Sequence, residues 1–258
     1  MRARAKIRAV VLRTVDYGES DRVVTLLSEE RGKLAAFARG ARASRRRFGG
    51  ALEPFTLLDA EVRERPGSDL LVLESVHVVR PFGAIRGDLA RIACAGYACE
   101  LARELVRDSE PHPDLVDLLV EYLGRLDSGP ARPAALRAFE LGALRAAGLM
   151  PRLDACARCG EAIAVAGEGE RLRFDPAQGG FLCRNCAPSS QGGREASPAT
   201  ARALAALQAA GLASAEAAMP ASVAAEARDV LTTFIEHHLG RRLAARRFLD
   251  EVGPALGT

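Results

Sequence analysis

The sequence predicts an α+β protein with a small β-barrel in residues 1–80, followed by an α-helical domain in residues 81–258. A four-cysteine zinc ribbon is expected as an insertion in the helical domain, at residues 152–190. Short β-rich runs separated by turn residues fill the first part, whereas apolar residues recur at helical spacing after Pro81. Two Cys-x-x-Cys pairs then interrupt the helical pattern, and such pairs are typical of zinc ribbons.

Five runs in the N-terminal part have the composition of β-strands, and turn residues such as Pro66-Gly67 separate them. The expected strands span residues 6–13, 22–27, 33–37, 52–63 and 70–79. Five short strands suit a small closed barrel, and their spacing is compatible with an OB-fold. Periodicity alone does not separate this fold from an SH3-like barrel.

A loop rich in arginine and glycine lies between the expected third and fourth strands, at residues 39–50. Residues 1–47 hold 13 Lys and Arg against 5 Asp and Glu, a formal charge of +8, whereas residues 48–258 carry −5. Because arginine pairs bidentately with phosphate, and glycine keeps a loop mobile, this end of the chain is expected to meet a polyanion. Phe48 is expected either to stack on a base or to pack against the barrel. The alternative is a basic face that is only solvated.

Five helices are expected after the barrel, with Asp88 in the N-cap region of the first and Pro133 in the first turn of the third. They span residues 89–106, 114–126, 133–147, 198–210 and 222–239, and an arginine-rich tail follows at 241–248. Cys94 and Cys99 lie five positions apart on the first helix, too far around its axis to share one ion easily. Both are expected to be small core residues.

The remaining four cysteines are expected to hold one structural zinc ion: Cys156, Cys159, Cys183 and Cys186. Each Cys-x-x-Cys turn directs two thiolates at one ion, and two turns complete a tetrahedral site with no open position. The alternatives are two disulfides, a redox dithiol or buried thiols. The chain shows no export signal or membrane span, which favours a cytoplasmic protein with reduced thiols. A βαβ pattern that would favour a redox dithiol is missing from the sequence.

No catalytic motif is evident. The sequence contains no P-loop, no Gly-x-Ser-x-Gly and no His-x-Glu deaminase signature. The four histidines lack a nucleophile or ligand partner and are expected to be structural or surface residues: His77, His112, His237 and His238. The protein is therefore expected not to be an enzyme.

Several short motifs follow one another in a fixed order along nearly the whole chain. They are residues 11–22, Gly32-Lys33-Leu34, Arg39-Gly40-Ala41-Arg42, residues 44–48, Leu52-Glu53-Pro54-Phe55, Cys156-Ala157-Arg158-Cys159-Gly160, and Gly179-Gly180 leading to Cys183. In this order they resemble the bacterial recombination-mediator family RecO.

The resemblance implies an N-terminal OB-fold, a zinc-loaded ribbon and a non-enzymatic role in recombinational repair. Proteins of this family bind single- and double-stranded DNA, anneal complementary strands and associate with RecR. They also contact the acidic C-terminal tail of single-stranded-DNA-binding protein (SSB) and help RecA load onto SSB-coated DNA. A nucleoid-associated cytoplasmic protein is expected.

The basic residues expected to contact DNA are Arg2, Arg4, Lys6, Lys33, Arg39, Arg42, Arg45, Arg46 and Arg47. The acidic tail is expected between the helices of residues 89–147, beside Arg103, Arg107, Arg125, Arg132 and Arg137. Three alternatives stay open: a zinc-ribbon protein that binds RNA or acts in transcription, a metal-dependent nuclease, and a structural adaptor whose basic loop meets acidic protein.

Overall fold

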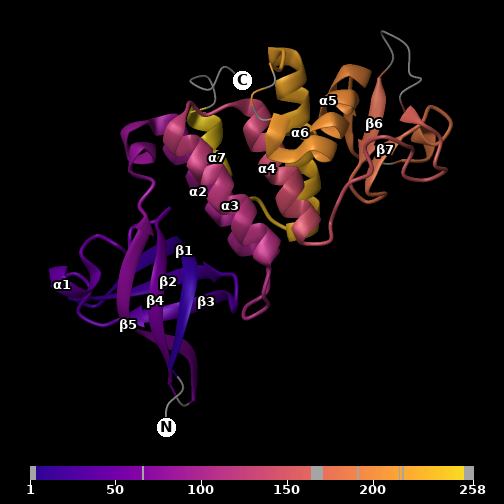
Figure 1. The fold of residues 1–258 in the computed structure, drawn as a ribbon. Coiled ribbons are helices and arrows are strands. Elements are labelled where there is room, and N and C mark those ends of the chain that lie inside the picture. Colours follow the sequence, from indigo (N-terminus) through magenta and orange to yellow (C-terminus); the bar gives the residue numbers. More distant parts are fainter. Residues whose placement is uncertain are drawn as a thin grey trace. The chain divides into compact units, whose positions relative to one another are not determined.

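The computed structural model describes residues 4–65, 67–163, 171–190, 192–214, 216 and 218–252. For Arg45 and Arg46 it describes the backbone alone, and Arg2 lies outside the described residues. The chain divides into two compact units, Met1–Pro130 and Ala131–Thr258 (Figure 1). The predicted domain boundary after residue 80 stays a prediction.

A closed barrel of five strands forms the first part of unit Met1–Pro130. The strands are β1 (Arg4–Tyr17), β2 (Asp21–Ser28), β3 (Gly32–Ala38), β4 (Leu57–Arg65) and β5 (Ser68–Arg80). Their order around the barrel is β1-β2-β3-β5-β4, with β3 and β5 parallel and the other neighbours antiparallel. This OB-like barrel, the helices that follow it and the clustered cysteines confirm the expected fold class.

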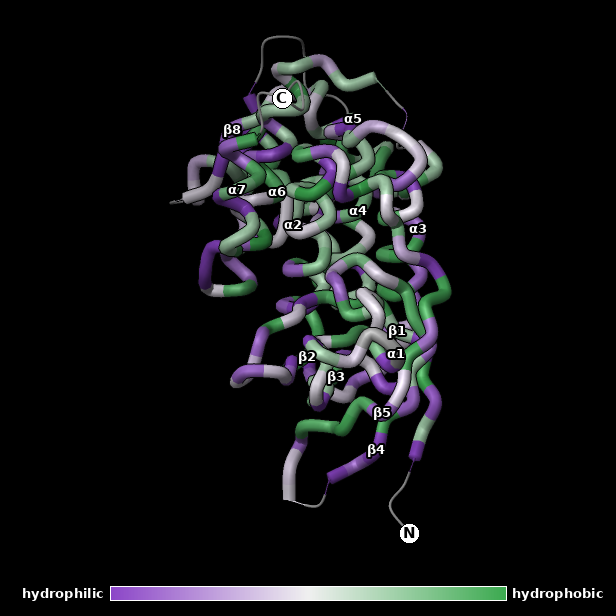
Figure 2. Tube along the Cα trace, turned by 90° about the vertical axis from the view of Figure 1, so that its left-hand side faces the viewer, coloured by the Kyte–Doolittle hydropathy of each residue, from purple (hydrophilic) through white to green (hydrophobic). Residues whose placement is uncertain are grey.

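Alternation along the strands builds the barrel core, and hydrophobic and hydrophilic residues follow one another in the hydropathy view (Figure 2). Ile7, Ala9 and Val11 of β1 point into the core. The register of β1 with β2 then shifts between Val11 and Arg13. A bulge of this kind adds one residue and exchanges the two faces of the strand. Arg13 and the alternate residues after it therefore face outward.

The expected strand of residues 52–63 is wrong in its first part, because β4 begins only at Leu57. Leu52 is 1% exposed and packs in the barrel core, but it does not lie in the sheet. Pro54 has no N–H to donate to a strand ladder, and Phe55 adopts a positive φ of 71°. The backbone therefore turns here before β4 starts.

Two long helices complete unit Met1–Pro130, after a 3₁₀ turn at Gly83–Gly87: α2 (Leu89–Leu105) and α3 (Pro113–Ser128). Asp88 caps α2, because its side chain accepts a hydrogen bond from the N–H of Arg91 at 2.8 Å. Both helices pack near β1. Cys94 and Cys99 are 1% and 2% exposed, which confirms them as core residues of α2.

Unit Ala131–Thr258 is helical, with a small sheet between its first two helices in sequence. Its helices are α4 (Pro133–Ala146), α5 (Pro198–Ala210), α6 (Ala221–Leu239) and α7 (Ala244–Val252); its strands are β6 (Leu172–Asp175), β7 (Gly180–Leu182) and β8 (Arg194–Ala196). Short 3₁₀ turns lie at Ala187–Ser189 and Gly211–Ser214. Among the described residues, none of the helices has the length and apolar character needed to cross a membrane.

Helix α7 is a correction to the expected arginine-rich tail of residues 241–248. Gly240 ends α6 in the left-handed conformation, and a new helix begins four residues later. Leu249 is buried, and the Arg246 guanidinium lies 2.8 Å from the Asp250 carboxylate one turn further on.

Candidate metal centre and nucleic-acid interface

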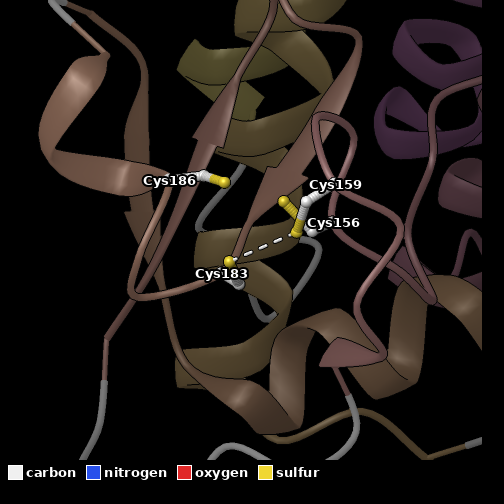
Figure 3. Close-up of side chains that lie close together, drawn as sticks. All are labelled: Cys156, Cys159, Cys183 and Cys186. Carbon is white, nitrogen blue, oxygen red and sulfur yellow. Dashed lines mark hydrogen bonds between the residues drawn. The ribbon is translucent and has the colours of Figure 1, made fainter.

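The four predicted metal ligands come together at one end of the small sheet. The sulfur atoms of Cys156, Cys159, Cys183 and Cys186 all lie within 4.8 Å of one another. Those of Cys159 and Cys183 are 3.7 Å apart (Figure 3). A disulfide needs a sulfur–sulfur distance of about 2.05 Å, so the four cysteines are free thiols here. The cluster could bind a metal ion.

Two tight turns present these sulfurs. In the first, the N–H of Gly160 donates to the Cys156 carbonyl at 2.9 Å, and Gly160 has a φ of +79°, which favours glycine. In the second, the N–H of Cys186 donates to the Cys183 carbonyl at 3.0 Å. The β6–β7 hairpin, in a sheet of order β7-β6-β8, leads into this second turn. A Cβ on Gly180 would lie 2.3 Å from the Arg152 carbonyl oxygen, so only glycine fits there.

The pKa values of the thiols in the cluster shift in opposite directions. Burial alone would raise the pKa of the Cys156 thiol, but hydrogen bonds from the backbone of Cys159, Cys183 and Arg158 outweigh burial and lower this pKa to about 6. Burial raises the pKa of the Cys183 thiol to about 12. Because a coordinated cation displaces the thiol proton, a bound metal would make both sulfurs thiolates.

Residues 39–48, which we call the basic turn, are held by hydrogen bonds at several points. Ser44 caps the short helix α1 (Arg45–Phe48), and the Arg47 guanidinium donates to the Arg39 carbonyl at 2.8 Å. The N–H of Arg42 donates to the Ser20 carbonyl at 3.0 Å. Phe48 is 3% exposed in the barrel core, so it packs against the barrel and is not available for stacking on a base.

Two arginines of the basic turn are open to solvent and differ in their partners. Arg39 is exposed, and within the described part of the chain its side chain has no ion-pair partner. Arg42 is half exposed; it donates to the Glu19 carbonyl at 2.9 Å and lies 3.8 Å from the Asp16 carboxylate. The side chains of Arg45 and Arg46 lie outside the described residues.

Three other predicted DNA contacts do not join the basic turn. Lys33 lies at the opposite end of β3, where its side chain is 18% exposed and 3.1 Å from the Asp108 carboxylate. Arg4 lies 3.2 Å from Glu74, and Lys6 lies 3.7 Å from Glu61. Each of these cations lies beside a carboxylate of its own unit.

The arginines expected to hold an acidic tail are also mostly paired. Arg103 lies 2.9 Å from Glu104, Arg125 lies 3.0 Å from Glu121, and Arg132 lies 2.8 Å from Glu216. Arg137 lies 2.9 Å from Glu140 in a buried pair within α4. Arg107 is exposed and follows the C-terminal end of α2 at Leu105.

Sequence reasoning missed one exposed aromatic side chain. Tyr17, at the end of β1, is 61% exposed, and its ring centroid lies 5.8 Å from that of Phe37 on β3. The first expected strand, residues 6–13, ends before Tyr17. The bulge at Val11 could not be predicted from the alternation of β1, and it decides which residues face outward.

In the comparison with known proteins, two separate family models match the N-terminal and C-terminal parts of the chain. Residues 1–82 match the family model described as "Recombination protein O N terminal", and residues 86–247 match "Recombination protein O C terminal". A protein named "DNA repair protein RecO" from Anaeromyxobacter sp. (strain Fw109-5) is 71% identical over 258 residues, which is 100% of both chains.

More distant relatives carry the same name. That of Myxococcus xanthus (strain DK1622) is 50% identical over 245 residues, which is 95% of this chain and 96% of the relative. That of Geobacter sulfurreducens is 41% identical over 249 residues, which is 96% of this chain and 98% of the relative. Both family models together cover most of the chain, so this protein belongs to the RecO family of DNA repair proteins.

Proposed function

We propose that this RecO-family protein acts without catalysis in recombinational repair: it binds single- and double-stranded DNA, anneals complementary strands and, with RecR, helps load RecA onto SSB-coated DNA in the cytoplasm. The observation that carries this proposal is the basic turn, where Arg39 is exposed and free of any carboxylate among the described residues. An annealing protein must accept any sequence, so it has to neutralise phosphates and not read bases. Strands pair by themselves once their repulsion is reduced.

Ordering of the basic turn supports this role. Hydrogen bonds to Arg39, Ser44 and Ser20 fix its backbone before any ligand arrives. Less conformational entropy is then lost when phosphates bind. Lys33, Arg4 and Lys6 are left out of the proposed surface because each lies beside a carboxylate away from the basic turn.

The metal that fits the cysteine cluster best is zinc, one ion per chain in a structural site. Zinc binds thiolate sulfur at about 2.3 Å in a tetrahedron, whose sulfur–sulfur edges are then about 3.8 Å. The 3.7 Å between Cys159 and Cys183 fits such an edge. Four sulfurs leave no position for a reactive water, so the ion would stabilise the ribbon and take no part in chemistry.

For the acidic C-terminal tail of SSB we propose a site on the helices that follow the barrel. Arg103 and Arg125 are paired with carboxylates on their own helices, so they are less available to bind the carboxylates of the tail. Arg107 is exposed and is the arginine that we test. The test is titration of a labelled acidic peptide with an apolar last residue against the full-length protein and its Arg107→Ala variant. Loss of affinity in the variant, or on removal of the last residue, supports the site; binding that is abolished by about 0.3 M salt and indifferent to both changes contradicts it.

DNA binding itself is tested by the dependence of oligonucleotide affinity on salt. If Arg39 and Arg42 neutralise about two phosphates, replacing both with alanine lowers the single-strand salt slope by roughly 1.4. Arg8 is the matched control, because it is an exposed barrel arginine that is paired with Asp59 at 2.9 Å. If the salt slope of the double variant is unchanged, Arg39 and Arg42 do not contact the phosphates and DNA binds at another site.

The three alternative functions can be tested with the same purified protein. A nuclease would shorten the labelled strand in a magnesium-dependent way. An RNA-binding protein would prefer a ribo-oligonucleotide over the deoxyribo-oligonucleotide of the same sequence. A structural adaptor would bind neither.

A further inference from the structure

The outer surface of the barrel has two different faces. Across β1, β4 and β5, opposite charges are neighbours: Lys6 is the register partner of Glu61, and Arg8 of Asp59. Nε of Arg8 lies 2.9 Å from the Asp59 carboxylate. Cross-strand pairs of this kind satisfy one another and leave little net charge for a ligand.

On β1, β2, β3 and β5, four outward residues at one level of the barrel are apolar. Val15, Val23, Phe37 and Val72 are register partners in one row across the four strands, which we call the apolar row. Val15 is 42% exposed and the other three are half-buried. Tyr17 lies beside this row and is 61% exposed, with its ring at 83° to that of Phe37. A single exposed apolar residue is ordinary, but a continuous apolar row with a second aromatic ring beside it marks a binding surface.

The strands that carry the two rings also carry cations. Arg13 alternates with Val15 and Tyr17 on the outer face of β1 and is exposed, and Arg39 follows directly after β3. The hydrogen bond from the Arg42 N–H to the Ser20 carbonyl holds the basic turn against the loop that follows Tyr17. Within the described ranges, neither Arg13 nor Arg39 has a carboxylate partner.

We propose that Tyr17 and Phe37 stack on unpaired bases, so that this face of the barrel selects single-stranded over double-stranded nucleic acid. The inference rests on the proposed function, because it assumes that the basic turn holds the phosphates of the same strand. Single-stranded nucleic acid alternates flat bases with anionic phosphates, and the surface offers aromatic rings beside arginines in the same way. Stacking tolerates any sequence because every base has a π-face. Bases in a duplex are already stacked on one another and are not available to the rings.

Tyrosine fluorescence can report this contact. It has no Trp and three Tyr. Tyr97 and Tyr122 are 1% and 0% exposed in α2 and α3, so Tyr17 is the tyrosine that a ligand can reach. Quenching of tyrosine emission by an oligonucleotide therefore reports stacking on Tyr17.

The test compares oligothymidine with an abasic oligomer of equal length, which keeps the phosphates and lacks the bases. Wild-type protein is expected to bind oligothymidine more tightly and to lose tyrosine emission on binding it. In Tyr17→Ala the affinity for oligothymidine falls by roughly tenfold, the scale of one stacked base. Its affinity for the abasic oligomer and for duplex DNA, and the salt slope, stay as in the wild type. Tyr17→Phe retains the affinity, because it keeps the ring.

Val79→Ala is the matched control, since Val79 is 41% exposed on β5 and lies outside the apolar row. Tyr17 is largely exposed, so its replacement is expected to leave thermal unfolding unchanged, which is measured alongside. If Tyr17→Ala binds oligothymidine as the wild type does, or weakens the abasic oligomer equally, the stacking inference is wrong while the proposed function stands. If the wild-type protein binds no DNA of any kind, both are wrong.

Discussion

The side-chain nitrogen of Lys33 donates a hydrogen bond to the carbonyl oxygen of Arg103, 2.8 Å away at the C-terminal end of α2. A cation at this end satisfies an unpaired carbonyl and the negative end of the helix dipole. The Ser109 N–H donates to the Lys33 carbonyl at 2.8 Å, so the segment after α2 also runs beside β3. A Cβ on Gly32 would lie 1.9 Å from the Glu110 carbonyl oxygen, which explains glycine there. Lys33 therefore joins the barrel to the helices of its own unit.

Replacing Lys33 with methionine is expected to lower the free energy of unfolding by about 1–3 kcal/mol, since a largely buried charged hydrogen bond is lost. Denaturant unfolding measures this effect. Lys6→Met is the control, because Lys6 is 86% exposed and its pair with Glu61 is worth under about 1 kcal/mol. If Lys33→Met has normal stability but a reduced salt slope of DNA binding, Lys33 contacts DNA and its structural role is contradicted.

Freshly purified, reduced protein is expected to contain one zinc per chain by metal analysis. Cys183→Ser removes one of four ligands, so it should lose metal and destabilise the ribbon while the barrel stays folded. Cys99→Ala is the control, because Cys99 lies in α2 outside the cluster and should leave the metal content unchanged. Metal-free wild-type protein, or full zinc content in Cys183→Ser, would contradict the assignment.

Replacing Arg45, Arg46 and Arg47 together with alanine should weaken DNA binding equally for all sequences. If these arginines neutralise about three phosphates, the single-strand salt slope falls by roughly 2. Fluorescence anisotropy over a range of salt concentrations measures the slope. Arg47 also donates to the Arg39 carbonyl, so the double variant Arg45→Ala with Arg46→Ala, which keeps this contact, separates loss of charge from loss of the turn's order. A sequence-dependent loss would argue for base readout in place of phosphate contact.

Glu226 is expected to make the stability of its unit depend on pH. Burial alone would raise its pKa, but hydrogen bonds from Thr200, Ser197 and Arg171 outweigh burial and lower the pKa from 4.5 to about 2. A depressed carboxyl pKa contributes stability that is present above pH about 4.5 and is lost as the pH falls toward 2. Glu226→Gln should therefore destabilise the protein at pH 7 by up to about 3 kcal/mol and have little effect near pH 2.

Urea unfolding at pH 7, 4 and 2.5 measures this pH dependence. The control is Glu251→Gln, because Glu251 is 62% exposed in its pair with Arg247 and should matter little at any pH. An equal loss of stability in Glu226→Gln at pH 7 and pH 2.5 would contradict the role of its charge.

The sequence predicted what depends on local spacing. The spacing of two Cys-x-x-Cys pairs predicted that their four sulfurs come together, and the helix boundaries at Asp88 and Pro133 follow from capping chemistry. Five strands followed from alternation and turn residues, apart from the late start of β4 at Leu57.

What the sequence could not predict depends on contacts between distant residues. Lys33 has the same basic side chain as Arg39, but a partner 70 positions away turns it into a structural residue. Phe48 lies next to arginines in sequence and is nevertheless buried in the barrel core. The one-residue bulge after Val11 decides that Tyr17 faces outward, and no pattern in β1 signals it.

The most direct test of the account is annealing of complementary oligonucleotides that are coated with their single-stranded-DNA-binding protein. Wild-type protein should speed annealing well above the rate of the coated strands alone, and Arg39→Ala with Arg42→Ala should lose most of that gain because fewer phosphates are neutralised. Arg8→Ala should anneal like the wild type, since Arg8 is already paired with Asp59. Wild-type protein that binds both strands but leaves the annealing rate unchanged would contradict the proposed function.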